Sequence, residues 1–182
     1  MGRAVALADL NGGGSLDAFV VHGNNWPYTA WFNDGQGNYT ESDQQWQQSG
    51  GFAIALGDVN GDGFPDAVVG RDGADEIWLN DGQGHFTRGQ RVGSGFTNAI
   101  FLADLDGDGD LDMVAGGHTG ARIWLNDGVG QFRKGQRIGH GRDQAIAVGD
   151  VTGDGIVDIF VAGVESYQVW RGVGNGRFTP VP

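Results

Sequence analysis

The sequence predicts an all-β protein built from four copies of one unit, and three observations lead to this prediction. First, the stretch LGDVNGDGFPDAVVG that begins at Leu56 returns with the same spacing at Leu7, Leu102 and Val148. Second, a stretch such as WLNDGQGHFT follows each copy, and its Asn-Asp-Gly cluster is typical of a tight turn between two strands. Third, 36 glycines and no cysteine in 182 residues fit many short strands joined by turns, without disulfides or thiolate chemistry.

The leading aspartate of each copy sets the length of the unit. Successive leading aspartates are 49, 46 and 46 residues apart, so the unit has about 46 residues and the first copy carries a three-residue expansion. The copies fill the chain, and we expect one domain. Its predicted units are 1–49, 50–95, 96–141 and 142–182.

Each unit is expected to contain four short strands. Before the acidic stretch, Ile54 and Leu56 alternate with small residues, which is the two-residue period of a strand. A second strand follows the acidic stretch, a third carries the Trp, and a fourth begins after the turn at an aromatic residue such as Phe86. No segment has a helical stripe of useful length. Four-stranded units at this spacing are typical of β-propeller blades, so we predict four four-stranded blades per chain.

The acidic stretch predicts a cation-binding loop. Counted from Asp58, oxygen-bearing side chains stand at positions 1, 3, 5 and 9, with glycine at positions 4 and 6, where a chain that wraps around an ion needs unusual backbone angles. Calcium takes six to eight oxygen ligands at about 2.3–2.6 Å, and a main-chain carbonyl near position 7 adds one. An EF-hand is excluded because its Glu at position 12 is replaced, by Val69 in this copy. The predicted calcium ligands are Asp58, Asn60, Asp62, the Phe64 carbonyl and Asp66; Asp104, Asp106, Asp108, the Asp110 carbonyl and Asp112; and Asp150, Thr152, Asp154, the Ile156 carbonyl and Asp158.

The first copy of the loop is degenerate. It has Gly13 at position 5 and so loses one carboxylate, which predicts weak or absent binding. For a single copy, an ordinary Asp-Gly turn on a solvated face is an equal alternative. Three copies at identical spacing favour a metal, because carboxylates crowded together without one repel each other. The residues of this weak or absent site are Asp9, Asn11, Ser15 and Asp17.

The pattern D-x-(D/N)-x-D-G-x-x-D after a strand such as FAIALGD resembles the FG-GAP and VCBS repeats, the blades of integrin α-subunit propellers and of many secreted proteins and lectins. The resemblance covers all four units. It implies a ring of seven or eight blades with calcium in the loop between the first two strands of a blade. Four units are half of eight, so we expect a homodimer that closes an eight-bladed ring; a closed four-bladed monomer and a fragment of a larger ring are the alternatives.

Composition narrows the function classes. A net charge of −12 with eleven scattered basic residues argues against a nucleic-acid partner, which needs clustered Lys and Arg. The longest apolar runs are far shorter than the roughly 20 residues of a membrane span. Loops rich in carboxylates but without the EF-hand Glu suit millimolar calcium, so we expect an extracellular or secreted protein.

The predicted function is a non-catalytic, calcium-binding module for binding or assembly. A calcium-dependent lectin is the alternative, because some propellers of this type bind sugars between blades. An enzyme active on polysaccharides is disfavoured: only His22 and His118 stand at matching places, and the acidic pairs already belong to the metal loops.

Residues that break the repeat are the candidates for a glycan or protein ligand. The first unit alone carries HGNNWPYTAW, where an aromatic side chain flanked by amides could stack on a sugar. The alternative is that Trp26 closes a gap between blades. The Trp that recurs at one register, as in Trp78, is expected in the core instead. The candidate ligand-binding residues are His22, Asn24, Asn25 and Trp26.

Overall fold

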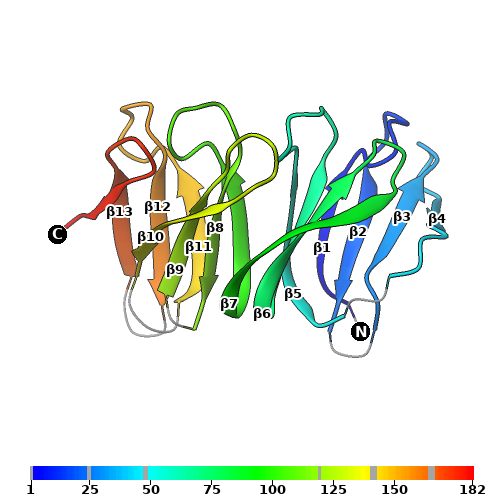
Figure 1. The fold of residues 1–182 in the computed structure, drawn as a ribbon, viewed down its shortest axis with the longest axis horizontal. Helices are drawn as coiled ribbons and strands as arrows, with labels where there is room; N and C mark the ends of the chain where they lie inside the picture. The colour runs from blue at the N-terminus through cyan, green and yellow to red at the C-terminus, as the bar shows by residue number, and fades with distance from the viewer. Residues whose placement is uncertain (1, 24–25, 47–48, 119, 140–142, 164–166) are drawn as a thin grey trace.

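The chain is all-β. The computed structural model describes residues 2–23, 26–46, 49–118, 120–139, 143–163 and 167–182, which form three antiparallel sheets and contain no helix (Figure 1). The strands are β1 Gly2–Ala8, β2 Asp17–His22, β3 Thr29–Asn33, β4 Tyr39–Glu41, β5 Gly51–Gly57, β6 Asp66–Asn80, β7 Phe86–Ala103, β8 Asp112–Gly117, β9 Gly120–Leu125, β10 Arg133–Ile138, β11 Asp143–Gly149, β12 Asp158–Gly163, β13 Tyr167–Gly172 and β14 Phe178–Pro180. The sheet orders are β1-β2-β3-β4, β10-β9-β8-β7-β6-β5 and β11-β12-β13-β14.

The first and last sheets each contain the four strands expected of one unit, but the middle two units share a single six-stranded sheet. The difference arises in β6 and β7, which are longer than any predicted strand. Residues 66–71 of β6 pair with β5, and residues 72–80 pair with β7, with Gly73 at φ 107° where the pairing changes. In the same way β7 continues from the fourth strand of the second unit into the first strand of the third, where it pairs with β8. None of the three sheets closes on itself.

The sheets stand side by side, and equivalent loops lie at the same end of the molecule. Each acidic loop joins the first and second strands of its unit, and all four loops lie along the upper edge in Figure 1. The strand register repeats as well. In all four units, the residue directly before the leading aspartate pairs with the last aspartate of the loop. These pairs are Ala8 with Asp17, Gly57 with Asp66, Ala103 with Asp112 and Gly149 with Asp158.

The core lies between units. Each of three apolar clusters joins one face of a unit to the facing side of the next. The recurrent Trp residues contribute as predicted: Trp78, Trp124 and Trp170 are at most 7% exposed, while Trp31, on the outer face of the first unit, is half-buried. Burial of these faces supplies the main stabilisation, because a single small sheet cannot cover its own apolar faces and needs the neighbouring unit to do so.

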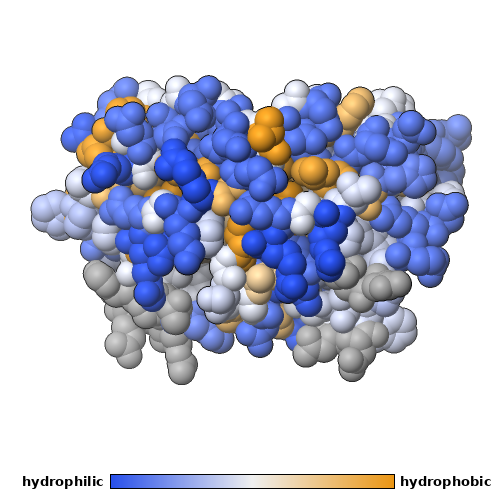
Figure 2. Space-filling view, viewed as in Figure 1, coloured by the Kyte–Doolittle hydropathy of each residue, from blue (hydrophilic) through white to orange (hydrophobic). Residues whose placement is uncertain are grey.

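The exterior in this view is largely hydrophilic, with small apolar patches between the sheets (Figure 2). Within the described residues, no helix exists that is long and apolar enough to cross a membrane.

Candidate metal centre and binding surfaces

The leading carboxylate of each acidic loop is turned inward and held by backbone N–H groups. In the third unit, Asp104 accepts hydrogen bonds from Gly107 N at 2.7 Å and from Gly109 N at 3.1 Å, one on each oxygen. Both glycines have positive φ, 86° and 94°, which lets the chain curl around the carboxylate. Asp58 and Asp150 accept equivalent bonds. In the first loop Asp9 accepts from Gly13 N and Gly14 N, so the first donor is one residue later.

The third unit gathers the strongest set of cation donors. Carboxylate oxygens of Asp104, Asp106 and Asp108 all lie within 4.8 Å of one another. Oδ1 of Asp106 is buried and has no hydrogen-bond partner. Burial and the neighbouring Asp108 carboxylate raise the pKa of Asp106. Since an unpartnered buried oxygen beside two further carboxylates is costly without a positive charge, this donor set fits a hard cation such as calcium.

The last aspartate of each loop has a structural task that the sequence analysis missed. Asp112 is completely buried, and its two oxygens accept hydrogen bonds from Leu105 N at 3.0 Å and Asn126 N at 2.8 Å. Burial raises the pKa of Asp112 to about 6, and the same cause raises the pKa of Asp66 to about 6. The carboxylate thereby ties the acidic loop to the third strand, and each oxygen keeps a lone pair for a cation. Asp17, Asp66 and Asp158 make the same pair of connections.

The remaining loops differ at position 5. Asp62 accepts hydrogen bonds from Asn60 Nδ2 at 2.8 Å and from Phe64 N at 2.9 Å. Asp154 forms an ion pair with Arg171 at 2.9 Å, and this hydrogen bond lowers the pKa of Asp154. In the first unit position 5 is Gly13, which has no carboxylate; its N–H donates to the side chains of Asn11 and Asp9. The third loop therefore offers the most carboxylate. A cation from the chain itself lies beside two of the loops: Arg171 in the fourth, and Arg133 in the third, where its Nη2 is 3.8 Å from Asp106 Oδ2.

The predicted ligand-binding stretch of the first unit is only partly brought together. Trp26 is 62% exposed, so its side chain is accessible. His22 is half-buried, its Nε2 lies 3.2 Å from Thr29 Oγ1, and burial lowers its pKa. Asn24 and Asn25 lie outside the described residues. His118, the other histidine considered, stacks on Phe96 with ring centroids 4.2 Å apart.

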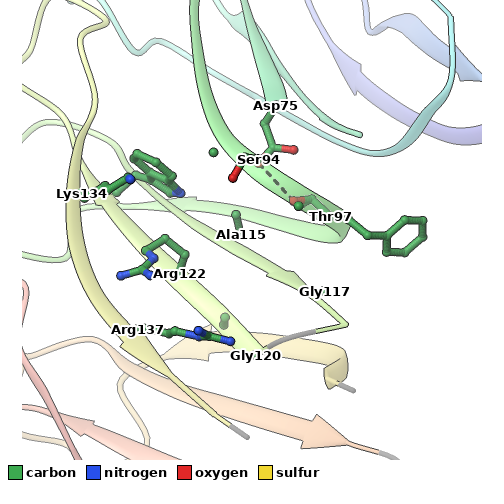
Figure 3. A pocket seen from close by; sticks show the side chains of 14 residues that line it. Asp75, Ser94, Thr97, Ala115, Gly117, Gly120, Arg122, Lys134 and Arg137 are labelled. Carbon is green, nitrogen blue, oxygen red and sulfur yellow. Dashed lines mark hydrogen bonds between the residues drawn. The ribbon is translucent and has the colours of Figure 1, made fainter. Parts of the chain in front are cut away.

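A pocket between the second and third units was not predicted. Its volume is about 240 Å³, and its lining comes from β6, β7, β8, β9 and β10 (Figure 3). Asp75, only 2% exposed, forms one wall and accepts hydrogen bonds from Arg71 N at 3.0 Å and Thr97 Oγ1 at 3.1 Å. Burial raises the pKa of Asp75 to about 7. The sequence held one indication of this site: Asp75 has no acidic counterpart in the third unit, where Ala121 stands at the equivalent position.

Comparison with known proteins agrees with this architecture. The family model of the FG-GAP-like repeat matches residues 9–69, 58–115 and 104–161, most of the chain, and the protein belongs to this family. The predicted resemblance is thus confirmed. A search of curated proteins found no match.

Two solved structures are similar. One is a lectin of Agrocybe aegerita, described as specifically recognising non-reducing terminal N-acetylglucosamine; it is 26% identical, the TM-score is 0.67, and the match covers 97% of this chain but 50% of the lectin chain. The other is the Vibrio cholerae biofilm matrix protein Bap1, 22% identical with a TM-score of 0.55, where the match covers 94% of this chain and 27% of Bap1. The chain therefore spans about half of the lectin chain, and the family and this neighbour indicate a β-structured binding module.

Proposed function

We propose that the protein is a non-catalytic binding module that forms half of an eight-bladed propeller, with calcium stabilising its acidic loops and a second copy completing the ring. The observation that carries this proposal is the complementarity of the two outer faces of the chain, those of the first and fourth units. Each outer face carries the residues that, inside the chain, pack against a neighbouring unit.

The outer face of the first unit exposes apolar side chains that are covered elsewhere. Val5 is 61% and Leu7 55% exposed, whereas their counterparts in the third unit, Ile100 and Leu102, pack into the cluster between the second and third units. A large exposed apolar area on a sheet is typical of an interaction surface.

The outer face of the fourth unit carries the opposite half of the same interface. Val151 is 65% and Phe160 37% exposed, whereas their counterparts in the third unit, Leu105 and Val114, are buried between the third and fourth units. One outer face therefore matches the other, as a repeated head-to-tail interface requires.

Polar groups of the outer faces complement each other as well. Between units, the side chain of Asn80 donates to Leu10 O at 2.9 Å, and that of Asn126 donates to Val59 O at 2.7 Å. Asn33 has the same position in the first unit, and Val151 has the position of the acceptor in the fourth. A head-to-tail contact between two copies would bring these two residues together.

The arrangement of first strands also favours a ring. A groove of about 380 Å³ is lined by residues from β1, β5, β7 and β11, the first strands of all four units. First strands that converge on one groove are what the central channel of a propeller requires. Two copies of this chain would also equal the length of the similar lectin chain, of which one copy matches half.

Calcium has a structural task in this proposal. The third loop would hold it through Asp104, Asp106 and Asp108, and the second and fourth loops through their equivalent residues. The ion would neutralise carboxylates and close the loops at one end of the ring. Millimolar calcium suits such loops, so we infer that the protein acts outside the cell.

Light scattering coupled to size exclusion, in calcium and at micromolar concentration, tests the ring. We expect a mass twice the 19.2 kDa of one chain. A mass of one chain would refute the two-chain ring.

Glycan binding is a second candidate function, favoured by the similarity to the Agrocybe aegerita lectin. A glycan array in calcium buffer tests it, and we expect bound glycans; an array without hits would rule out the lectin function and leave the ring intact.

A further inference from the structure

The pocket between the second and third units has an unusual charge for this protein. The chain has eleven basic residues and a net charge of −12, yet three basic side chains, those of Arg122, Lys134 and Arg137, line this one pocket. Lys134 is the only lysine of the chain. Figure 3 shows Arg122 and Arg137 on the same side of the pocket, across from Asp75. Positive charge is thus concentrated in the lining of this pocket.

Two of these three side chains, Arg122 and Lys134, have no carboxylate partner among the described residues. Arg122 donates to the backbone carbonyl of Gly135 at 3.2 Å. Asp75 is the one acidic residue of the lining. Because its oxygens already accept hydrogen bonds from Arg71 N and Thr97 Oγ1, it contributes to the wall rather than pairing with the basic groups.

One of the three basic residues, Arg122, is specific to this pocket, whereas Lys134 and Arg137 have the basic counterparts Arg88 and Arg91 in the second unit. The counterpart of Arg122 is Glu76 in the second unit and Gln168 in the fourth. Glu76 is buried and pairs with Arg71, so the equivalent place one unit earlier is filled by an internal ion pair. The positive charge at this position is therefore not required by the shared fold.

The shape of the pocket suits a single sugar ring. Its volume of about 240 Å³ lies just below the range of pockets for drug-sized ligands. Trp124 belongs to the lining with 6% of its surface exposed, and the hydroxyl of Ser94 adds a polar group. Gly117 in the lining lets two backbones approach closely, because a Cβ there would lie 1.7 Å from the Phe96 carbonyl oxygen.

We propose that this pocket binds an acidic sugar, with the ring against Trp124 and its carboxylate or sulfate group between Arg122 and Lys134. The proposal rests on the glycan-binding function and specifies its ligand class. An arginine beside an acidic group forms charge-assisted hydrogen bonds, which are about twice as strong as neutral ones. A neutral sugar uses only the Ser94 hydroxyl and the Trp124 side chain, and therefore binds more weakly.

Titration calorimetry in calcium with four probes tests this assignment: glucuronic acid, N-acetylglucosamine 6-sulfate, N-acetylglucosamine and inorganic sulfate. We expect one or both acidic sugars to bind at least about tenfold more tightly than N-acetylglucosamine, a difference of about 1.4 kcal/mol. The stronger of the two identifies the acidic group as carboxylate or sulfate. If inorganic sulfate binds as tightly as the sulfated sugar, the sugar ring contributes nothing to binding, and the proposal of a sugar pocket is wrong.

Variants locate the binding. Arg122→Gln with Lys134→Gln is expected to remove the preference for acidic sugars, while the matched control Arg88→Gln, at the counterpart of Lys134 in the second unit, leaves it unchanged. If acidic and neutral sugars bind with equal affinity, or if the double variant keeps the preference, the acidic-sugar pocket is wrong while the lectin function stands. If no sugar binds at all, the acidic-sugar pocket and the glycan-binding function are both wrong.

Discussion

The side-chain amide of Gln90 forms a pair of hydrogen bonds with the backbone of Phe132, in the next unit of the chain. Nε2 donates to the Phe132 carbonyl at 3.0 Å, and the Phe132 N–H donates to Oε1 at 2.6 Å. Gln44 with Phe86 and Gln136 with Phe178 repeat this arrangement. The glutamine thus satisfies the first backbone groups of the fourth strand one unit further on, where no neighbouring strand reaches them.

Removing this connection should weaken the contact between units. For Gln90→Ala, we expect a loss of about 1–3 kcal/mol in the free energy of unfolding, because Phe132 N–H and C=O are left without partners at a partly buried position. Urea unfolding followed by tryptophan fluorescence measures it. Gln83→Ala, at an exposed turn, is the matched control and should change stability by less than about 0.5 kcal/mol. Equal stability of the two variants would show that the connection is incidental.

Chelation of calcium is expected to lower the melting temperature. Each site that binds only the folded chain stabilises it by about 2.7 kcal/mol at one hundred times Kd, and EDTA removes this contribution. Asp62→Ala and Asp108→Ala should each reproduce part of the loss, whereas Asp43→Ala changes an exposed acid outside the loops and should not. A melting curve that EDTA does not move, with no calcium found by elemental analysis, would contradict the assignment of these loops.

The buried carboxyl of Asp75 should make stability fall as pH rises. Its pKa is raised from 3.8 to about 7 by burial, so between these values the folded chain holds a proton that the unfolded chain has released. Folding therefore takes up a proton in this window, and the free energy of unfolding decreases from pH 4 to pH 7, by at most about 1.4 kcal/mol per pH unit. Above pH 7 the Asp75 carboxyl is ionised in the folded chain as well, and the loss of stability is complete.

Asp75→Asn isolates this effect. An amide accepts the same hydrogen bond from Arg71 N and needs no proton, so we expect the variant to gain stability relative to the parent at pH 8 and less at pH 5. Thermal melts at the two pH values measure the difference. Asp72→Asn, which changes an exposed neighbour, serves as control. Parallel pH profiles of parent and Asp75→Asn would mean that the carboxyl does not titrate in this range.

The sequence revealed the repeat and the strand order, because spacing and two-residue periods are local signals. Ile54 and Leu56 could be placed on a strand without knowing their neighbours. It did not reveal the continuous β6 and β7, since whether a turn interrupts a strand at Gly73 depends on the partner strands across it.

The same limit applies to the candidate sites. The acidic loops were found because all their oxygens lie within nine residues of sequence. The pocket joins Asp75 to Lys134, which are 59 positions apart and become neighbours only when two units pack. The buried roles of Asp112 and Gln90 depend likewise on backbone groups from distant strands. A position-by-position comparison of the copies would have identified Asp75 as a residue that breaks the repeat.

Opposite charges placed on the two outer faces provide the sharpest test of the ring. Leu7→Lys or Phe160→Glu alone introduces an unpaired charge into the proposed head-to-tail contact, so each variant should have the mass of one chain in light scattering. The double variant brings the two charges together across that contact, because the counterparts Leu102 and Val68 belong to the same cluster, and should recover part of the dimer. Val129→Lys, at a turn where Val129 is 62% exposed, should leave the mass of two chains unchanged. Single variants that remain dimeric would place the contact between copies elsewhere on the surface.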